Sequence, residues 1–352
     1  VPPVTRVLKR GQYDAPGEVV TADVPSFLPP LGAAAPRNRL GLARWLTSPE
    51  HPLTARVEVN RRWLQCFGEG LVATLSDFGS QGEMPSHPDL LDWLAVRFVE
   101  SGWDVKQLLR LIVTSATYRQ SAVATPALLQ RDPENRLFAR GPRFRLPAEM
   151  IRDQALAVSG LLVEKIGGPP VKPYQPPGLW EAVSYNGELS YQPDRDEGRW
   201  RRTVYSFWKR TAPPPGVQLL DGPTRETCVV RRPRTNTPLQ ALLLLNDETY
   251  VEAARALAAS VLTRPGELRS GMDPVSGRDG GPAAEIFRRA TARLPDAKES
   301  TALAGLFARQ RGRFAADPAA ARKLVNVGTS SRGHERDAVE LAAWTVVAQT
   351  VL

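Results

Sequence analysis

Signals for helix starts recur along this chain and restrict it to a mainly helical fold. In the stretch Thr-Pro-Leu-Gln, Thr237 can cap a helix, Pro238 fits its first turn and Gln240 completes a capping box. Asp104 and Gln107 have the same spacing. Both starts precede apolar residues spaced three and four apart, which is the period of an amphipathic helix. The sequence therefore predicts two helices that begin directly after Thr237 and Asp104.

The same pattern of caps, apolar faces and Gly or Pro stops predicts about eleven helices. Ser86 is the predicted cap of the third, and the helix after Thr237 is so apolar that we expect it to be central. Alternation predicts one or two minor strands, with candidates at 4–9 and 202–208. The fold class is mainly α: a multi-helix globular domain with a Pro/Gly-rich irregular middle. The predicted helices are 40–48, 54–67, 88–101, 104–120, 147–166, 237–246, 248–262, 283–293, 296–315, 318–327 and 337–352.

Composition shifts along the chain suggest its domain organisation. Residues 1–37 are proline-rich and predict an extended arm. Residues 38–262 form the expected main helical domain, with an irregular insertion at 167–235. A Gly-rich linker at 264–282 precedes a C-terminal helical unit at 283–352. Because the chain begins without Met and stops inside a helical pattern, we expect a piece of a longer protein, its last unit truncated.

The net charge of +9 comes almost wholly from arginine, with 39 Arg against 7 Lys. A basic surface favours anionic partners such as phosphate, sulfate or carboxylate groups. A GC-rich genome, which favours arginine codons, explains the same excess without any partner. The arginines are scattered, and only 195–210 approaches the basic, aromatic-containing stretch of a nucleic-acid site. Nucleic-acid binding is therefore the weakest of the alternatives. No apolar run is long enough to cross a bilayer.

Cysteine and histidine usage argues against a metal or redox centre in this piece. Cys66 and Cys228 lie far apart without a CxxC partner, so we expect two buried free thiols rather than one disulfide. The three histidines have no metal-ligand spacing. We expect no metal and no cofactor bound by these residues.

The stretch 77–94 holds the densest set of reactive side chains, separated by glycines and prolines that indicate a shaped loop. His87 is the candidate general acid or base, with Asp77 as its orienting partner and Gln81 as a substrate contact. The structural alternative is that His87 anchors the loop and that Asp77 caps a turn. No known catalytic signature appears, so the sequence names no reaction.

Other candidates are polar residues beside apolar helix faces. Arg61 can bind an anionic group, or it can pair with a carboxylate such as Asp153 or Glu149 inside the protein. Tyr118 completes the candidate catalytic set and Arg119 is a candidate substrate contact, because tyrosine, histidine, arginine and asparagine together can carry out acid/base chemistry on acidic sugars. The same residue types also form interior ion-pair networks. The remaining candidate substrate contacts are Asn60, Arg152, Asp153, Arg232 and Asn236.

Aromatic residues gather in the irregular middle of the chain. Beside Gly and Pro loops, such rings either stack on sugar faces or bury as a satellite core. Trp180 is the candidate substrate contact among them. The others are Tyr185, Tyr191, Trp200, Tyr205 and Trp208.

Five motifs together resemble one family, the planctomycete domain of unknown function fifteen fifty-three, also called the "PSD one" domain. They are HPLTARVEVNRRWLQCFGEGLV (51–72), DFGSQGEMPSHPDLLDWLA (77–95), GWDVKQLLRLIVTSATYRQS (102–121), RLPAEMIRDQAL (145–156) and RRPRTNTPLQALLLLND (231–247). The resemblance covers nearly the whole chain. One departure is His51, where the family more usually has Asn.

The resemblance implies a C-terminal module of an exported, multidomain surface protein, and hence an extracytoplasmic place. It also implies an upstream c-type cytochrome domain. Any haem would belong to that part, because this sequence has no CxxCH. Three hypotheses follow: a module that binds or processes a polysaccharide, with anionic polymers included; a docking domain for the upstream cytochrome; and, least favoured, a nucleic-acid-binding protein.

Overall fold

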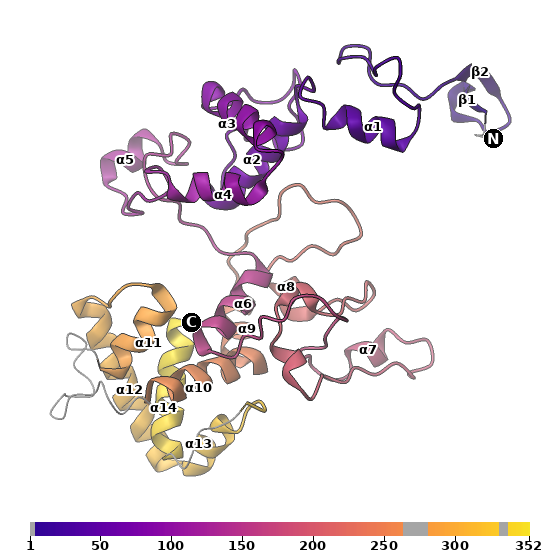
Figure 1. The fold of residues 1–352 in the computed structure, drawn as a ribbon. Helices are drawn as coiled ribbons and strands as arrows, with labels where there is room; N and C mark the ends of the chain where they lie inside the picture. Colours follow the sequence, from indigo (N-terminus) through magenta and orange to yellow (C-terminus); the bar gives the residue numbers. More distant parts are fainter. Residues whose placement is uncertain (1–3, 263–280, 331–336) are drawn as a thin grey trace. The chain divides into compact units, whose positions relative to one another are not determined.

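The structure is a computed structural model that describes residues 4–262, 281–330 and 337–352 (Figure 1). The chain divides into two compact units, Val1–Phe144 and Arg145–Leu352. The described residues form fourteen α-helices and one two-stranded sheet. The predicted mainly α fold is confirmed.

The two units are defined by the contacts among their residues. The predicted domains at 1–37, 38–262 and 283–352 were defined as pieces that fold separately, so these boundaries stay a prediction. All but the last two residues of the predicted linker at 264–282 lie outside the described residues. None of the helices among the described residues is both long and apolar enough to cross a bilayer.

The first unit begins with the small antiparallel sheet of β1 (Thr5–Leu8) and β2 (Pro16–Val20), in which Thr5 pairs with Val20. The predicted strand at 4–9 is therefore confirmed. Its partner β2 was not predicted, because the many prolines of this segment argue against regular structure. The only proline of β2 is its first residue, a position that strands tolerate. The helices that follow are α1 (Arg39–Leu46), α2 (Thr54–Phe67), α3 (Pro88–Glu100), α4 (Val105–Thr114) and α5 (Pro126–Arg131).

The core of the first unit lies where α2, α3 and α4 meet around Val59, Leu91 and Ile112. Asp104 caps α4 and accepts the Gln107 N–H at 3.0 Å, but the predicted capping box is incomplete, because no return bond from the Gln107 side chain is present among the described residues. The predicted cap of α3 is wrong. His87 occupies the N-cap position without a side-chain bond, because the Ser86 N–H and hydroxyl both donate to the Leu71 carbonyl.

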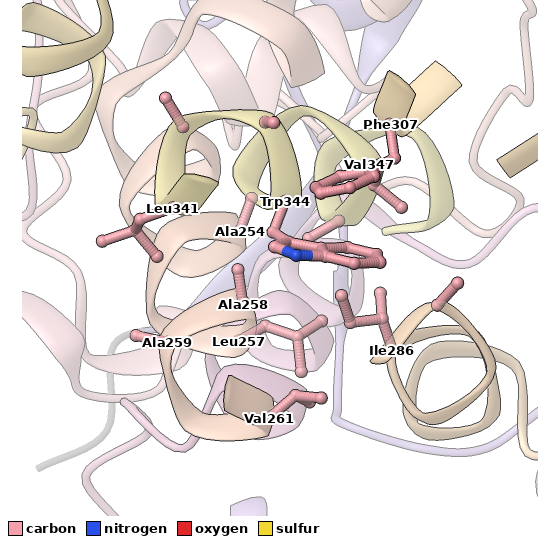
Figure 2. Packing of buried hydrophobic residues seen from close by; sticks show 14 of the residues in the cluster. Ala254, Leu257, Ala258, Ala259, Val261, Ile286, Phe307, Leu341, Trp344 and Val347 are labelled. Atoms are coloured by element: carbon pink, nitrogen blue, oxygen red, sulfur yellow. The ribbon is translucent and has the colours of Figure 1, made fainter. Parts of the chain in front are cut away.

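The second unit is built on α10 and α14, which pack side by side (Figure 2). Trp344 of α14 is fully buried, and its ring stacks on Phe307 of α12 with centroids 4.1 Å apart. Small residues such as Ala254 and Ala258 let the helices approach closely. The helices are α6 (Ala148–Ser159), α7 (Leu179–Ala182), α8 (Pro215–Leu219), α9 (Pro238–Asn246), α10 (Glu248–Leu262), α11 (Pro282–Thr291), α12 (Ala297–Ala316), α13 (Pro318–Val325) and α14 (Ala338–Val351).

Two structural expectations for the second unit are wrong. The predicted strand at 202–208 is instead a 3-10 turn, Thr203–Tyr205, because Asp153 accepts the Thr203 N–H at 2.7 Å and its hydroxyl at 2.6 Å. The capping box at Thr237 is confirmed, but α9 is not central. Its only buried residue is Gln240, and Leu239, Leu242 and Leu245 each keep half or more of their surface exposed.

Both cysteines are free. Cys66 is partly buried, and burial raises the pKa of its thiol. Cys228 is exposed, so the expectation of two buried thiols is wrong for this residue. It lies in a loop in which every residue from 224 to 237 is exposed.

Candidate functional site

A hollow in the second unit, which we call the α6–α10 pocket, is the candidate site. It is lined by Ala148 and Arg152 of α6, Val217 of α8, and Thr249 and Tyr250 of α10. Including its open mouth it measures about 520 Å³, but only about 50 Å³ of it is room for solvent. A water molecule needs roughly 10–15 Å³ by that measure, so the deep part fits a small chemical group.

Arg152 forms the inner wall of the pocket and is buried. Its Nη1 donates to the Arg201 carbonyl at 2.9 Å and to the Thr203 hydroxyl at 3.1 Å, and its Nη2 donates to the Arg199 carbonyl at 2.5 Å. Burial lowers the pKa of this guanidinium, and the neighbouring Asp153 carboxylate opposes that effect. Arg152 therefore holds the 199–203 segment against α6 and shapes the pocket.

Asp247 brings a carboxyl group to the pocket at the junction of α9 and α10. It caps α10, since its Oδ1 accepts the Thr249 N–H at 2.9 Å. Burial raises the pKa of Asp247, although Thr249 and the Arg152 charge act in the other direction. A helix-capping aspartate usually has a lowered pKa. The raised pKa of Asp247 means that burial disfavours its ionised form more than the helix cap favours it. Such a group in a hollow is a functional-site candidate.

Tyr250 stands one turn along α10 and shares the pocket. Burial, and then the nearby Asp247 charge, raise the pKa of its phenol, which therefore stays protonated and can donate a hydrogen bond. Among the described residues, neither the Tyr250 hydroxyl nor that of Ser206, also on the pocket wall, has a hydrogen-bond partner. The pocket thus presents a carboxyl group and two hydroxyl groups that can serve a ligand.

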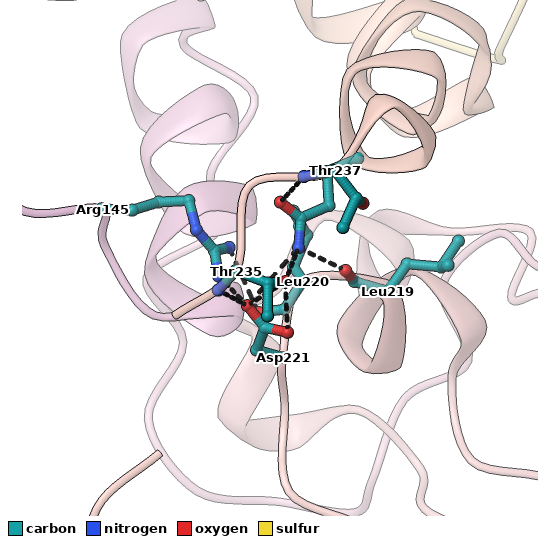
Figure 3. Close-up of polar contacts among 7 residues, drawn as sticks. Arg145, Leu219, Leu220, Asp221, Thr235 and Thr237 are labelled. Carbon is teal, nitrogen blue, oxygen red and sulfur yellow. Dashed lines mark hydrogen bonds and ion pairs between the residues drawn. The ribbon is translucent and has the colours of Figure 1, made fainter. Parts of the chain in front are cut away.

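A polar cluster around Asp221 fixes the segment that leads into α9 (Figure 3). Asp221 accepts the Thr235 N–H at 2.7 Å and the Thr235 hydroxyl at 2.8 Å, and it forms an ion pair with Arg145. Gln240 donates to the Leu219 carbonyl at 2.9 Å and to the Thr235 hydroxyl at 2.9 Å. The start of α9 is therefore tied to α8, and the far end of α9 leads directly to Asp247.

The pocket joins two of the five sequence motifs. Arg152 belongs to 145–156, and Asp247 closes 231–247. Of the two, only Arg152 was among the predicted site residues. Asp247, Tyr250 and Asp221 were not predicted. The signal available for Asp247 was its place as the single carboxylate between two apolar helices, where a helix cap is the ordinary interpretation.

The predicted catalytic residues all lie in the first unit. His87 Nδ1 is 3.0 Å from the Ser86 hydroxyl, and its ring packs on Phe138 with centroids 5.7 Å apart. Asp77 Oδ1 accepts the Gly79 N–H at 2.7 Å, which closes a turn. The ring of Tyr118 packs edge-on against Phe67. His87 and Tyr118 thus contact neighbouring rings of one aromatic cluster, while Asp77 serves its own loop. Their catalytic roles stay a prediction.

The predicted substrate contacts of the first unit have different surroundings. Asn60 is buried, and its amide pairs with both backbone groups of Val72, at 3.0 and 2.9 Å. Arg61 is half exposed and its guanidinium lies 4.0 Å from the Glu58 carboxylate. The alternative that Arg61 pairs with Asp153 or Glu149 of the second unit stays a prediction. Gln81 and Arg119 are exposed.

Asp153 and Arg232 of the second unit form ion pairs. Asp153 lies 3.4 Å from Arg202, and Arg232 donates to Glu149 at 2.7 Å. Asn236 is exposed. Trp180 is buried against Tyr191 and Phe207, as a satellite core would be. The predicted set is therefore divided between the two units, and only Arg152 lines the α6–α10 pocket.

No group of three or more His, Cys, Asp or Glu side chains within the described ranges is arranged to hold a metal ion. No curated protein and no solved structure gave a match to this sequence. A family model described as a protein of unknown function (DUF1553) matches residues 38–307, which includes both motifs of the pocket. The chain therefore belongs to the PSD1 family of proteins of unknown function (DUF1553).

Proposed function

We propose that the second unit binds a hydroxylated ligand in the α6–α10 pocket, and that this ligand is the end of a polysaccharide chain. The observation that carries the proposal is the Asp247 carboxyl in the pocket near the Tyr250 hydroxyl, which has no hydrogen-bond partner within the described part of the chain. A carboxyl group accepts bonds from sugar hydroxyls, and a phenol can donate to a ring or hydroxyl oxygen. The small deep space suits a chain end or a side group rather than a whole chain.

The charges in the pocket favour a neutral ligand over an anionic one. Three hydrogen bonds from the Arg152 terminal nitrogens go to protein oxygens, so this guanidinium offers little to a ligand carboxylate or sulfate. Asp247 would repel such a group wherever it is ionised. The sequence hypothesis covered polysaccharides in general, anionic polymers included. Of these we propose the neutral ones, bound by a chain end, as the ligand of the pocket. We place the module outside the cytoplasm, a proposal that rests on the family resemblance.

The test compares the wild-type protein with Asp247→Asn and Tyr250→Phe, using soluble neutral, uronic and sulfated polysaccharides in calorimetric titrations. Glu197→Gln is the matched control, because Glu197 is an exposed acid of the same unit. We expect neutral chains to bind and both pocket variants to bind about tenfold more weakly, the loss expected for a buried polar contact or two. Equal affinities for wild type and both variants would overturn the proposal. A reducing-end assay on the same mixtures shows whether Asp247 also supplies a proton for cleavage.

The exposed face of α9 favours a second candidate, a docking domain. Leu239, Leu242 and Leu245 are spaced three residues apart and are at least half exposed. Contiguous exposed apolar residues mark interaction sites. The partner implied by the family resemblance is an upstream domain of the same polypeptide, such as a c-type cytochrome.

This candidate is tested by adding the upstream portion in trans and measuring its affinity for the wild-type protein and for Leu242→Lys. Leu294→Lys is the control, because Leu294 is also more than half exposed and lies elsewhere in the same unit. A docking face predicts that only the α9 variant loses binding. If both variants bind the upstream portion like the wild type, α9 is not the docking face.

A further inference from the structure

A second hollow, the α3–α4 groove, lies in the first unit. It has room for about 320 Å³, whereas the α6–α10 pocket has about 50 Å³ by the same measure. Small-molecule sites typically span about 300–1,000 Å³. The groove therefore has space for a sugar ring, and the pocket has space for a substituent only.

Trp93 gives the groove its exposed aromatic surface. Its side chain is 49% exposed, although the adjacent Leu94 is buried in the core. Trp93, Arg97 and Glu100 all line the groove, and their spacing places them on one face of α3. The Arg97 guanidinium carbon lies 5.6 Å from the centre of the Trp93 ring. A tryptophan exposed to this degree at a hollow offers a flat apolar surface to a ligand.

Polar groups that can serve a ligand surround that surface. The exposed Gln107 side chain from α4 has no hydrogen-bond partner among the described residues. Arg97 and Glu100 are 3.4 Å apart and both are more than half exposed, so their pairing is weak and can be exchanged for a ligand hydroxyl. The Ser101 hydroxyl is already used, because it donates to the Phe98 carbonyl and accepts the Asp104 N–H.

We propose that the α3–α4 groove binds a sugar ring within a neutral polysaccharide, with Trp93 as the stacking surface. A pyranose has an apolar C–H face and a rim of hydroxyl groups. Here the indole of Trp93 complements the apolar face. The amide of Gln107, the guanidinium of Arg97 and the carboxylate of Glu100 complement the hydroxyl rim. A purely apolar ligand would desolvate the Gln107 amide and the Arg97–Glu100 pair without offering a hydrogen bond to either. The choice of a polysaccharide as ligand rests on the proposed function. The geometry of the groove does not, because its residues belong to the first unit and the α6–α10 pocket belongs to the second.

The experiment titrates the full chain with cellohexaose, mannohexaose and xylohexaose and compares the wild type with Trp93→Ala, Trp93→Phe and Gln107→Ala. We expect Trp93→Ala to raise the Kd of the bound hexasaccharide about tenfold and Trp93→Phe to raise it less, because a smaller ring still stacks. Gln107→Ala should raise the Kd a few-fold. Tyr13→Ala is the matched control, since Tyr13 is an exposed aromatic residue of the same unit, and its Kd should not change.

A second measurement separates stacking from a folding defect. Ligand should change the tryptophan fluorescence of the wild type and not that of Trp93→Phe, while the far-ultraviolet circular dichroism of all variants stays the same. Binding that survives Trp93→Ala but is lost in Asp247→Asn would overturn the groove and leave the pocket proposal standing. Binding that is lost in Trp93→Ala but survives Asp247→Asn would support the groove proposal and overturn the pocket proposal. Absence of binding to all three hexasaccharides overturns the groove proposal.

Discussion

The indole N–H of Trp200 donates a 2.9 Å hydrogen bond to Oε2 of Glu252, a carboxylate with no exposed surface. The other carboxylate oxygen, Oε1, accepts the backbone N–H groups of Thr329 and Ser330 at 2.7 and 2.6 Å. One side chain of α10 thereby joins the irregular middle of the chain to the turn that follows α13. Such charge-assisted hydrogen bonds are strong when they are buried.

Glu252→Ala should destabilise the second unit by about 3 kcal/mol or more. The substitution removes the acceptor of three N–H donors, of which that of Ser330 is buried, and it removes the carboxylate 3.8 Å from the buried Arg255 guanidinium. The free energy of unfolding in urea measures the loss. Glu197→Ala is the control, because its pair with Lys165 is exposed and should contribute less than about 1 kcal/mol. Equal stabilities for the two variants would contradict the role assigned to Glu252.

Asp221→Asn should flatten the acid dependence of stability. Burial alone would raise the pKa of Asp221, but its bonds from Thr235 and the Arg145 charge outweigh burial and lower it. A lowered folded-state pKa stabilises the fold above the unfolded value of about 3.9, and that contribution is lost as pH falls through the folded-state pKa.

Melting temperatures between pH 3 and 7 test this expectation. The wild type should lose more stability on acidification than Asp221→Asn, and the two curves should converge at the acid end. Asp196→Asn is a suitable control, because Asp196 also accepts a backbone N–H, that of Gly198 at 2.8 Å, but forms no ion pair among the described residues. Parallel curves for wild type and Asp221→Asn would mean that the cluster of Figure 3 contributes no pH dependence.

Asp247→Asn should leave the fold as stable as the wild type or more stable at pH 7. A raised folded-state pKa means that the folded protein holds a proton that the unfolded chain releases, so stability declines as pH rises from about 3.9 through the folded-state pKa. Asparagine removes this penalty and still caps α10.

The stability difference between Asp247→Asn and the wild type should therefore appear above about pH 4 and be absent below it. Unfolding curves at pH 3.5 and pH 7 measure it. Asp247→Ala is the companion variant, and it should be less stable than Asp247→Asn by about 1 kcal/mol because it lacks the cap to the Thr249 N–H. A wild type that is more stable than Asp247→Asn at pH 7 would show that the carboxylate is favourable where it lies.

Local signals predicted where most of the longer helices begin, because caps such as Asp104 and Thr237 act within one turn of the chain. The short helices α5, α7 and α8 were not predicted, and the predicted helices at 104–120 and 147–166 extend past the observed ends of α4 and α6. The site was less accessible to sequence reasoning. Whether Asp247 is only a helix cap or also a pocket carboxyl depends on α6 and α8, which are distant in sequence. Conversely, His87 and Asp77 looked reactive because of their residue types, while their hydrogen bonds in the structure are to their own loop.

The same limit explains the error over α9. Its run of leucines predicts burial by composition, but burial depends on what packs against each face. Only Gln240 is fully buried, and Leu243 and Leu244 are partly buried. Leu242→Gln should therefore change the free energy of unfolding by less than about 0.5 kcal/mol. Leu257→Ala, in the fully buried row of α10, should cost about 2–5 kcal/mol. Urea unfolding of the two variants measures the contrast, and a large cost for Leu242→Gln would show that α9 is covered in solution.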